Sequence, residues 1–170
     1  MDFAKYVREI PDWPKKGILF YDISTLLGNA QAFSATIDAL AAHYANQKID
    51  VVVSVEARGF IFGGALAYKL GAAFVPARKP GKLPWQKIRA EYALEYGTDA
   101  IEMHKDALVP GQRVLIFDDV LATGGTVAAT ADLVRCLGGQ IVGTAFLIDL
   151  TFLKGREKLA GQEVFALIQY

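Results

Sequence analysis

Short apolar runs alternate with amphipathic segments along this sequence, and the alternation restricts its fold more than any other feature. Runs such as VVVSV at 51–55 are rich in β-branched residues, which favours buried strands. Segments such as 124–139 repeat apolar residues at helical spacing and end at two glycines. Strand–helix–strand units build a mostly parallel sheet. We therefore predict an α/β fold, a twisted and mostly parallel sheet flanked by helices, formed by residues 1–170 as a single domain. The expected strands cover 51–55, 72–77, 113–119, 141–150 and 164–169, and the expected helices cover 32–47, 59–71 and 124–139.

Composition argues against several classes of function. The 18 Lys and Arg residues balance 18 Asp and Glu residues, whereas general nucleic-acid binding needs a basic surface. The single cysteine, Cys136, cannot form an intramolecular disulfide, which is typical of a reducing compartment, and its helical spacing predicts a buried position. No apolar run is long enough to span a bilayer, and the charged N-terminal residues lack a signal-peptide core. We expect a cytoplasmic protein without nucleic-acid or membrane partners.

The stretch IFDDVLATGGT at 116–126 carries the strongest functional signal. A helix N-terminus presents unpaired N–H groups and the positive end of the helix dipole, and glycines let the backbone approach an anion closely. Asp118 and Asp119 come just before this loop and would repel a phosphate unless a sugar lay between them. We therefore expect the two carboxylates to accept hydrogen bonds from ribose hydroxyls and to stabilise a cationic ribose carbon. The stretch LATGGT at 121–126 would form the phosphate cradle.

Two other interpretations of this stretch remain. An Asp-rich turn followed by a capped helix would show the same residues. A Walker B strand would also resemble VLIFDD, but the sequence contains neither the lysine-bearing Walker A loop nor a GxGxxG fingerprint.

Two stretches do not fit the alternation of strands and helices. Residues 1–30 are rich in proline and aromatic residues, and residues 78–97 are basic, with further proline and aromatic residues. A long irregular stretch inside a compact domain is usually a functional loop. The basic stretch would suit a polyanion, and its alternative interpretation is a solvated basic hairpin that contacts RNA or another anionic surface.

Several blocks together resemble a known family. VLIFDDVLATGGT is similar to the phosphoribosyl-diphosphate-binding motif of type I phosphoribosyltransferases. The further blocks resemble the adenine phosphoribosyltransferases of that family, from about residue 10 to residue 170; they are WPKKGILFYDIS, EARGFIFG, RKPGKLP, EYALEYGT and KGREKLA. The resemblance implies transfer of ribose 5-phosphate from 5-phosphoribosyl 1-diphosphate to N9 of adenine, giving AMP and pyrophosphate in purine salvage. It also implies Mg²⁺, arriving with the phosphates of the donor, and a homodimer.

The resemblance implies that the 5-phosphate is held by Ala122, Thr123, Gly124, Gly125 and Thr126.

The resemblance also assigns roles to residues outside the cradle. Arg58 would lie in a pyrophosphate loop that carries a non-proline cis peptide near Glu56–Ala57. Lys79 and Lys82 would bind pyrophosphate within a flexible lid hairpin at about 78–97. Glu95 would exchange a proton with the purine and is counted with Asp118 and Asp119 as catalytic, and Tyr96 would pack in the lid and contact substrate. No metal-binding residues are expected, because nothing metal-like surrounds His43 or His104.

The base pocket would be formed by a small hood at about 1–30. Backbone atoms of Leu19 and Tyr21 would read the edge of the purine, and Phe20 would stack or pack near it. Many relatives carry arginine at the position of Tyr21, so a second hypothesis is the same donor with a different purine as acceptor. A third is a non-catalytic sensor of the donor or of AMP, which predicts a DNA-binding extension or a damaged site, and the sequence shows neither.

Overall fold

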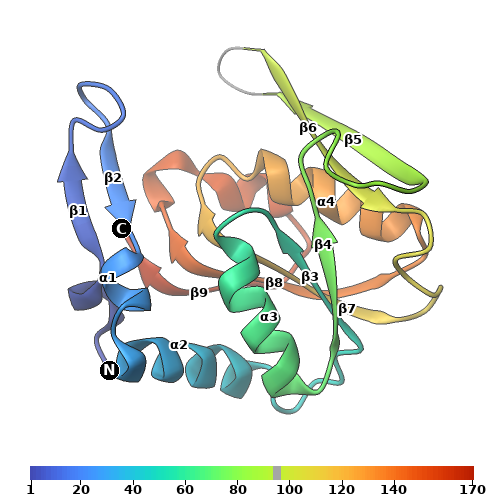
Figure 1. The fold of residues 1–170 in the computed structure, drawn as a ribbon, viewed down its shortest axis with the longest axis horizontal. Helices are drawn as coiled ribbons and strands as arrows, with labels where there is room; N and C mark the ends of the chain where they lie inside the picture. The colour runs from blue at the N-terminus through green and yellow to red at the C-terminus, as the bar shows by residue number, and fades with distance from the viewer. Residues whose placement is uncertain (94–96) are drawn as a thin grey trace.

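We describe the protein from a computed structural model, which describes residues 1–93 and 97–170. The expected strands and helices are confirmed, with ends shifted by a few residues (Figure 1). The elements are, in chain order, η1 (Phe3–Tyr6), β1 (Arg8–Pro11), β2 (Leu19–Asp22), α1 (Ser24–Leu27), α2 (Ala30–His43), β3 (Val51–Val55), α3 (Gly59–Leu70), β4 (Ala73–Ala77), β5 (Lys87–Ala93), β6 (Thr98–His104), β7 (Arg113–Leu121), α4 (Gly125–Cys136), β8 (Gln140–Asp149), η2 (Thr151–Leu153), η3 (Gly155–Leu159) and β9 (Val164–Gln169).

The central sheet contains five parallel strands in the order β4-β3-β7-β8-β9. The predicted α/β fold with a parallel sheet is therefore confirmed. From β3 the chain moves outward to β4, and from β7 it moves in the other direction to β8 and β9. The order thus reverses between β3 and β7, and in open α/β sheets ligands bind beyond the carboxyl ends of the strands at such a point.

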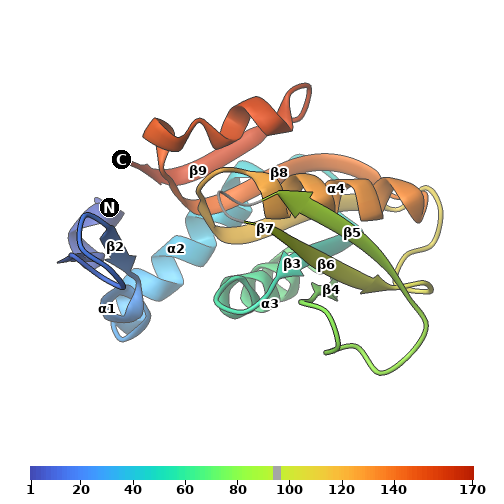
Figure 2. The same ribbon diagram turned by 90° about the horizontal axis from the view of Figure 1, so that it is seen from above.

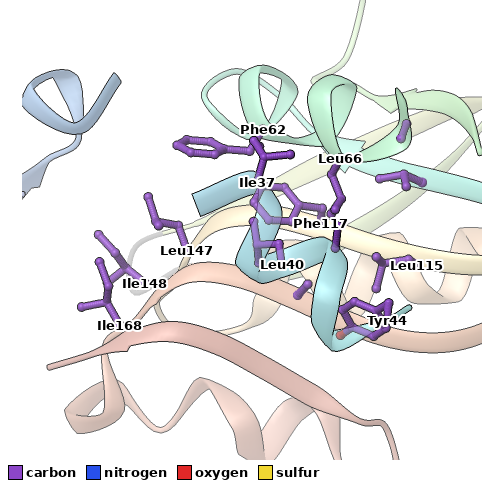
Figure 3. Close-up of a cluster of buried hydrophobic side chains, with 14 of the residues drawn as sticks. Ile37, Leu40, Tyr44, Phe62, Leu66, Leu115, Phe117, Leu147, Ile148 and Ile168 are labelled. Carbon is purple, nitrogen blue, oxygen red and sulfur yellow. The ribbon is translucent and has the colours of Figure 1, made fainter. Parts of the chain in front are cut away.

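Each face of the sheet buries its own apolar core, because successive side chains of a strand point to opposite faces. Val52, Leu115 and Phe117 face the helices α2 and α3, where they pack with Phe62 and Leu66 (Figure 3). On the opposite face, the alternate residues Val51, Val53, Val114 and Ile116 of the same strands pack with Val134 of α4 and Ile101 of β6. The sheet is covered on both faces, as Figure 2 shows, which explains why β3 is buried at every position.

Two antiparallel hairpins stand outside the central sheet. β1 pairs with β2 near the chain ends, and β5 pairs with β6 above α4 (Figures 1 and 2). The second hairpin corresponds to the lid expected at about 78–97, but its strand β6 continues to His104. No helix in the described part of the chain is long and apolar enough to cross a membrane.

One expectation about the core is wrong. Cys136 is exposed rather than buried, because it is the last residue of α4 and lies outside the stripe of Val127, Ala131 and Val134 that faces the sheet.

Candidate active site

The two adjacent carboxylates lie where the order of the strands reverses. The pairing of β3 with β7 ends at Ser54 and Phe117. Since β7 continues to Leu121, Asp118 and Asp119 extend past the last paired residues of these two strands. The expected strand end at 119 was two residues short, since β7 also pairs with the long strand β8. Gly59 makes this arrangement possible, because a Cβ there would lie 3.1 Å from Asp118 Oδ1.

Both carboxylates are harder to ionise than exposed aspartates. Burial raises the pKa of Asp118 well above its usual value, and the neighbouring charge of Asp119 raises it further. Burial also raises the pKa of Asp119, although the guanidinium of Arg58 opposes this shift. A pair held in this way is suited to a ligand that brings hydroxyl donors or developing positive charge.

Arg58 joins the carboxylates to the β1–β2 hairpin. Its Nε lies 2.6 Å from Asp119 Oδ2, but its N–H is not aligned with that oxygen, which has no hydrogen-bond partner. The contact is therefore ionic. The guanidinium also lies 5.2 Å from the centre of the Phe20 ring and donates to the carbonyl of Tyr21 at 3.5 Å. One cation thus links the sugar-binding carboxylates expected from the sequence with the expected base pocket.

The expected cis peptide between Glu56 and Ala57 is present. Glu56 accepts hydrogen bonds from the side chain of Arg78 at 3.1 Å and from the backbone N–H of Lys79 at 2.5 Å, and it pairs with Lys82 at 3.3 Å. Burial opposes ionisation, but these contacts outweigh it and lower the pKa of Glu56. Sequence reasoning missed Glu56, although its place directly after β3, in EARG, could have indicated it.

A second carboxylate holds the other lysine of the basic segment. The ammonium of Lys79 contacts the Tyr92 hydroxyl and Asp99, and Tyr92 donates to Asp99 at 3.0 Å. Burial lowers the pKa of Lys79, but the contacts with Asp99 and Tyr92 outweigh it and the net shift is upward. The contact with Lys79 lowers the pKa of Asp99. Asp99 was not singled out from the sequence, and Tyr92 was expected only to pack in the lid, because this pairing forms only when the β5–β6 hairpin folds back over residue 79.

The loop from Ala122 to Thr126 forms a small hollow at the N-terminus of α4. Gly124 has a φ of 77°, a left-handed conformation that favours glycine. A Cβ there would lie 2.4 Å from the carbonyl oxygen of Gly155. A Cβ at Gly125 would lie 3.2 Å from Tyr92 Cδ2. The loop is therefore enclosed by η3 on one side and by the β5–β6 hairpin on the other, and its backbone N–H groups can meet an anion.

The β1–β2 hairpin supplies the aromatic part of the site. Phe20 packs edge-on against Trp13 at 4.3 Å between ring centres, and Leu19 is exposed. Tyr21 is buried, and its ring stacks on that of Tyr170 at 4.2 Å. The side chain of Tyr21 is therefore committed to packing, and its carbonyl is the part that reaches Arg58.

Most of the residues predicted from the sequence come together here. Arg58, Asp118 and Asp119 lie at one end of the sheet beside the phosphate loop, and Lys79 and Lys82 gather around Glu56 and Asp99. The predicted residues Glu95 and Tyr96 lie outside the described residues. Within residues 1–93 and 97–170, no three His, Cys, Asp or Glu side chains are grouped to hold a metal.

Comparisons with known proteins show which family the chain and its fold belong to. The profile of the phosphoribosyl transferase domain family matches residues 24–162. The chain is 59% identical over 164 residues to an adenine phosphoribosyltransferase of Acidobacterium capsulatum, a match that covers 96% of this chain and 91% of the relative. It superposes on the crystal structure of the Thermoanaerobacter pseudethanolicus adenine phosphoribosyltransferase with a TM-score of 0.96 at 54% identity, covering 99% and 98% of the two chains.

A more distant solved structure was obtained with ligands. The adenine phosphoribosyltransferase of Trypanosoma brucei, described in complex with AMP, pyrophosphate and ribose-5-phosphate, has a TM-score of 0.90 at 27% identity. The match covers 98% of this chain and 78% of the other.

Proposed function

The chain belongs to the adenine phosphoribosyltransferases of the type I phosphoribosyltransferase family, and from this membership we propose how its residues divide the work of the reaction. The enzyme transfers ribose 5-phosphate to adenine and forms AMP in purine salvage. One observation supports this division most strongly: Asp118, Asp119, the glycine-rich loop and Arg58 lie together at one end of the sheet.

Positioning of the ribose is assigned to the loop and the two carboxylates. Backbone N–H groups from Ala122 to Thr126 hold the 5-phosphate at the start of α4. Asp118 and Asp119 accept hydrogen bonds from the two ribose hydroxyls. As the bond from C1 to the diphosphate breaks, positive charge develops on the ribose, and the same carboxylates stabilise it. N9 of adenine then bonds to C1 and pyrophosphate leaves.

Pyrophosphate is assigned to the basic residues around Glu56. Lys79 pairs with Asp99, and Lys82 pairs with Glu56. When the donor binds, its diphosphate replaces these carboxylates as the ionic partner of the two lysines. Residues 78–97 act as the lid that closes over the donor and excludes water. Arg58 lies in the loop after β3 and orients Asp119.

Recognition of adenine is assigned to the hood at about 1–30. Phe20 offers an aromatic face, and backbone groups of Leu19 and Tyr21 read the edge of the purine. The stacking of Tyr21 on Tyr170 supports a backbone role at position 21, so the absence of the arginine common in relatives is compatible with adenine as the acceptor.

Mg²⁺ is proposed as the cofactor. It prefers oxygen ligands and keeps several waters, binding through one or two carboxylates plus substrate phosphates. The residues present fit that description through Asp118, which lines the hollow of the phosphate loop and forms no ion pair within residues 1–93 and 97–170. Asp119 Oδ2 is already paired with Arg58. When bound, the ion would neutralise the charge of the diphosphate. The protein's own part is to hold the hydroxyls and phosphates in place.

Glu95 is proposed to exchange the proton of the purine, from its place in EYALEYGT. Glu95→Ala should lower kcat by roughly tenfold, below the usual effect of a general acid or base, because departure of the diphosphate precedes most of the bonding to N9. The KM for the donor should change little. Steady-state kinetics with each substrate varied would check this, and an unaffected kcat would remove Glu95 from the reaction.

The raised pKa of Asp118 predicts a dependence on pH. Only the ionised carboxylate accepts both hydroxyl hydrogen bonds, so donor affinity should rise as the pH rises through the pKa of Asp118. Stability should change in the opposite direction. The folded state binds more protons between the unfolded and folded pKa values, so the free energy of unfolding falls as the pH rises through that window.

Asp118→Asn removes this titration and tests both trends. The variant should bind the donor weakly at every pH. At pH 7 its melting temperature should exceed that of the wild type. The increase should be about 2–4 °C for each kcal/mol by which the substitution removes the cost of burying the Asp118 charge. The difference in melting temperature should vanish near pH 3. Calorimetry across pH would check this, and a lower melting temperature at pH 7 would contradict the assigned direction of the pKa.

A cytoplasmic homodimer is proposed as the working form. Helix α3 and strand β4 expose large apolar side chains: Ile61 is 44% exposed, Tyr68 89% and Phe74 38%. A second copy would bury them and bring the basic segment of one chain towards the site of the other. Sedimentation velocity should show two chains per particle, and a monomer at micromolar concentration would overturn the proposal.

The assay that tests the function uses purified protein, 5-phosphoribosyl 1-diphosphate and Mg²⁺, with adenine, guanine, hypoxanthine and xanthine offered separately. AMP and pyrophosphate should form from adenine alone, and EDTA should abolish turnover. Product from another base would shift the assigned specificity and make Tyr21 the first residue to exchange for arginine. Donor binding without any product would instead indicate a sensor.

A further inference from the structure

The block KGREKLA at 154–160 contacts the phosphate loop directly. The carbonyl oxygen of Ala122 leaves no room for a side chain at Gly155, where a Cβ would lie 2.3 Å from it. Gly124 meets the carbonyl of Gly155 in the same way. Leu159 is buried in the core beneath η3. Two glycines and one buried leucine therefore fix the start of η3 against the loop.

The geometry of a 3₁₀ helix then places Lys158. Side chains at i and i+3 eclipse in such a helix, so Lys158 lies on the same face as Gly155, the face that touches the loop. Its Nζ lies 3.8 Å from the Cβ position of Gly125. The ammonium therefore reaches the first residue of α4, where the loop's N–H groups converge.

The arginine of η3, Arg156, does not face the phosphate loop but ties η3 to the sheet. Arg156 pairs through Nε with the buried Asp149 at 2.6 Å and donates to the carbonyl of Val164 at 2.9 Å. It holds η3 on strands β8 and β9. Among residues 1–93 and 97–170 no carboxylate forms an ion pair with Lys158.

The phosphate loop itself offers no cationic side chain. It lacks the lysine of a Walker A loop, its neighbours Asp118 and Asp119 are acidic, and the guanidinium of Arg58 is occupied by Asp119. A phosphate monoester carries close to two negative charges at neutral pH. Backbone N–H groups alone would leave that charge beside two aspartates, whereas an ammonium within reach would offset it.

We propose that Lys158 binds the 5-phosphate of the donor and of AMP, as the side-chain cation of the phosphate loop. The inference rests on the proposed placement of the 5-phosphate at residues 122–126. Lys158 contributes to the binding of every ligand that carries this phosphate and to none that lacks it.

The test compares Lys158→Gln with Lys154→Gln, which removes the same charge from the exposed residue just before η3. Calorimetry would measure the binding of ribose 5-phosphate, AMP and inorganic pyrophosphate to each full-length variant. Lys158→Gln should weaken ribose 5-phosphate and AMP by about tenfold, the usual scale for one charge-assisted hydrogen bond. Pyrophosphate affinity and the KM for adenine should stay unchanged. Lys154→Gln should match the wild type, and Lys158→Arg should recover most of the affinity.

Three results would overturn the proposal: unchanged ribose 5-phosphate affinity in Lys158→Gln, an equal loss for pyrophosphate, or an equal loss in Lys154→Gln. The last two would show a general effect of charge. Failure of the placement at 122–126 has its own signature, since ribose 5-phosphate would then bind Gly125→Val as tightly as the wild type. A lower melting temperature of Lys158→Gln would identify a folding defect. In that case Lys158→Arg decides the question: restored ribose 5-phosphate affinity supports the proposal, and affinity that stays low overturns it.

Discussion

Asp119→Asn is expected to lower kcat/KM for the donor by about 10²–10³-fold, the scale seen when one electrostatic contact to a transition state is removed. The amide keeps the shape of the side chain but loses the charge that faces the ribose. It also loses the ionic contact with Arg58 Nε, now 2.6 Å away. Arg58 would then be free to leave the carbonyl of Tyr21, so adenine affinity should fall as well, by a smaller factor.

The fold should tolerate this change. Burial makes the ionised Asp119 costly, so its neutral replacement should leave the melting temperature equal or higher. The matched control is Asp132→Asn, which removes an aspartate from the exposed face of α4, where it pairs with Arg135. That variant should keep full activity. Wild-type turnover in Asp119→Asn would remove the sugar-binding role from this residue.

Gly125→Val is expected to weaken donor binding by at least about 100-fold, the scale of losing two hydrogen bonds to a charged group. A Cβ at this position already lies 3.2 Å from Tyr92 Cδ2 and 3.6 Å from the carbonyl oxygen of Ala93. The two methyl groups of valine would have to enter the hollow or displace the β5–β6 hairpin. Either response keeps the 5-phosphate from the N–H groups at the start of α4.

A graded series separates this effect from general instability. Gly125→Ala adds only the Cβ, which the Tyr92 ring can accommodate by a small shift, so its donor affinity should lie between those of the wild type and Gly125→Val. Titration with ribose 5-phosphate, beside thermal melts of all three proteins, would measure the series. Tight binding by a folded Gly125→Val protein would show that the phosphate does not approach the loop here.

Local sequence was enough for the scaffold. The run at 51–55 could only be a strand buried on both faces, and it became β3 in the centre of the sheet. The phosphate loop was equally clear, because a strand, a glycine pair and an amphipathic helix follow one another within 116–136. Elements of this kind depend on side-chain periodicity and on glycine, both of which are properties of neighbouring residues.

Sequence alone was less informative where partners lie far apart along the chain. Nothing near Arg58 indicates that its guanidinium will meet Asp119 and the Tyr21 carbonyl, and the stack of Tyr21 on Tyr170 joins residues from opposite ends of the chain. The contacts of Glu56 with Arg78 and Lys82, and of Asp99 with Lys79 and Tyr92, were overlooked for the same reason.

The sequence by itself therefore determined the five strands of the central sheet, the helices α2, α3 and α4, the phosphate loop and the family to which the chain belongs. The tertiary structure alone decided which charges meet. The reversal of strand order between β3 and β7 places Arg58 beside Asp119. The fold of the β5–β6 hairpin places Asp99 beside Lys79, and the packing of η3 places Lys158 beside Gly125. A side chain's ionic partner depends on the distance between atoms, which the packing of the sheet sets and spacing along the chain does not.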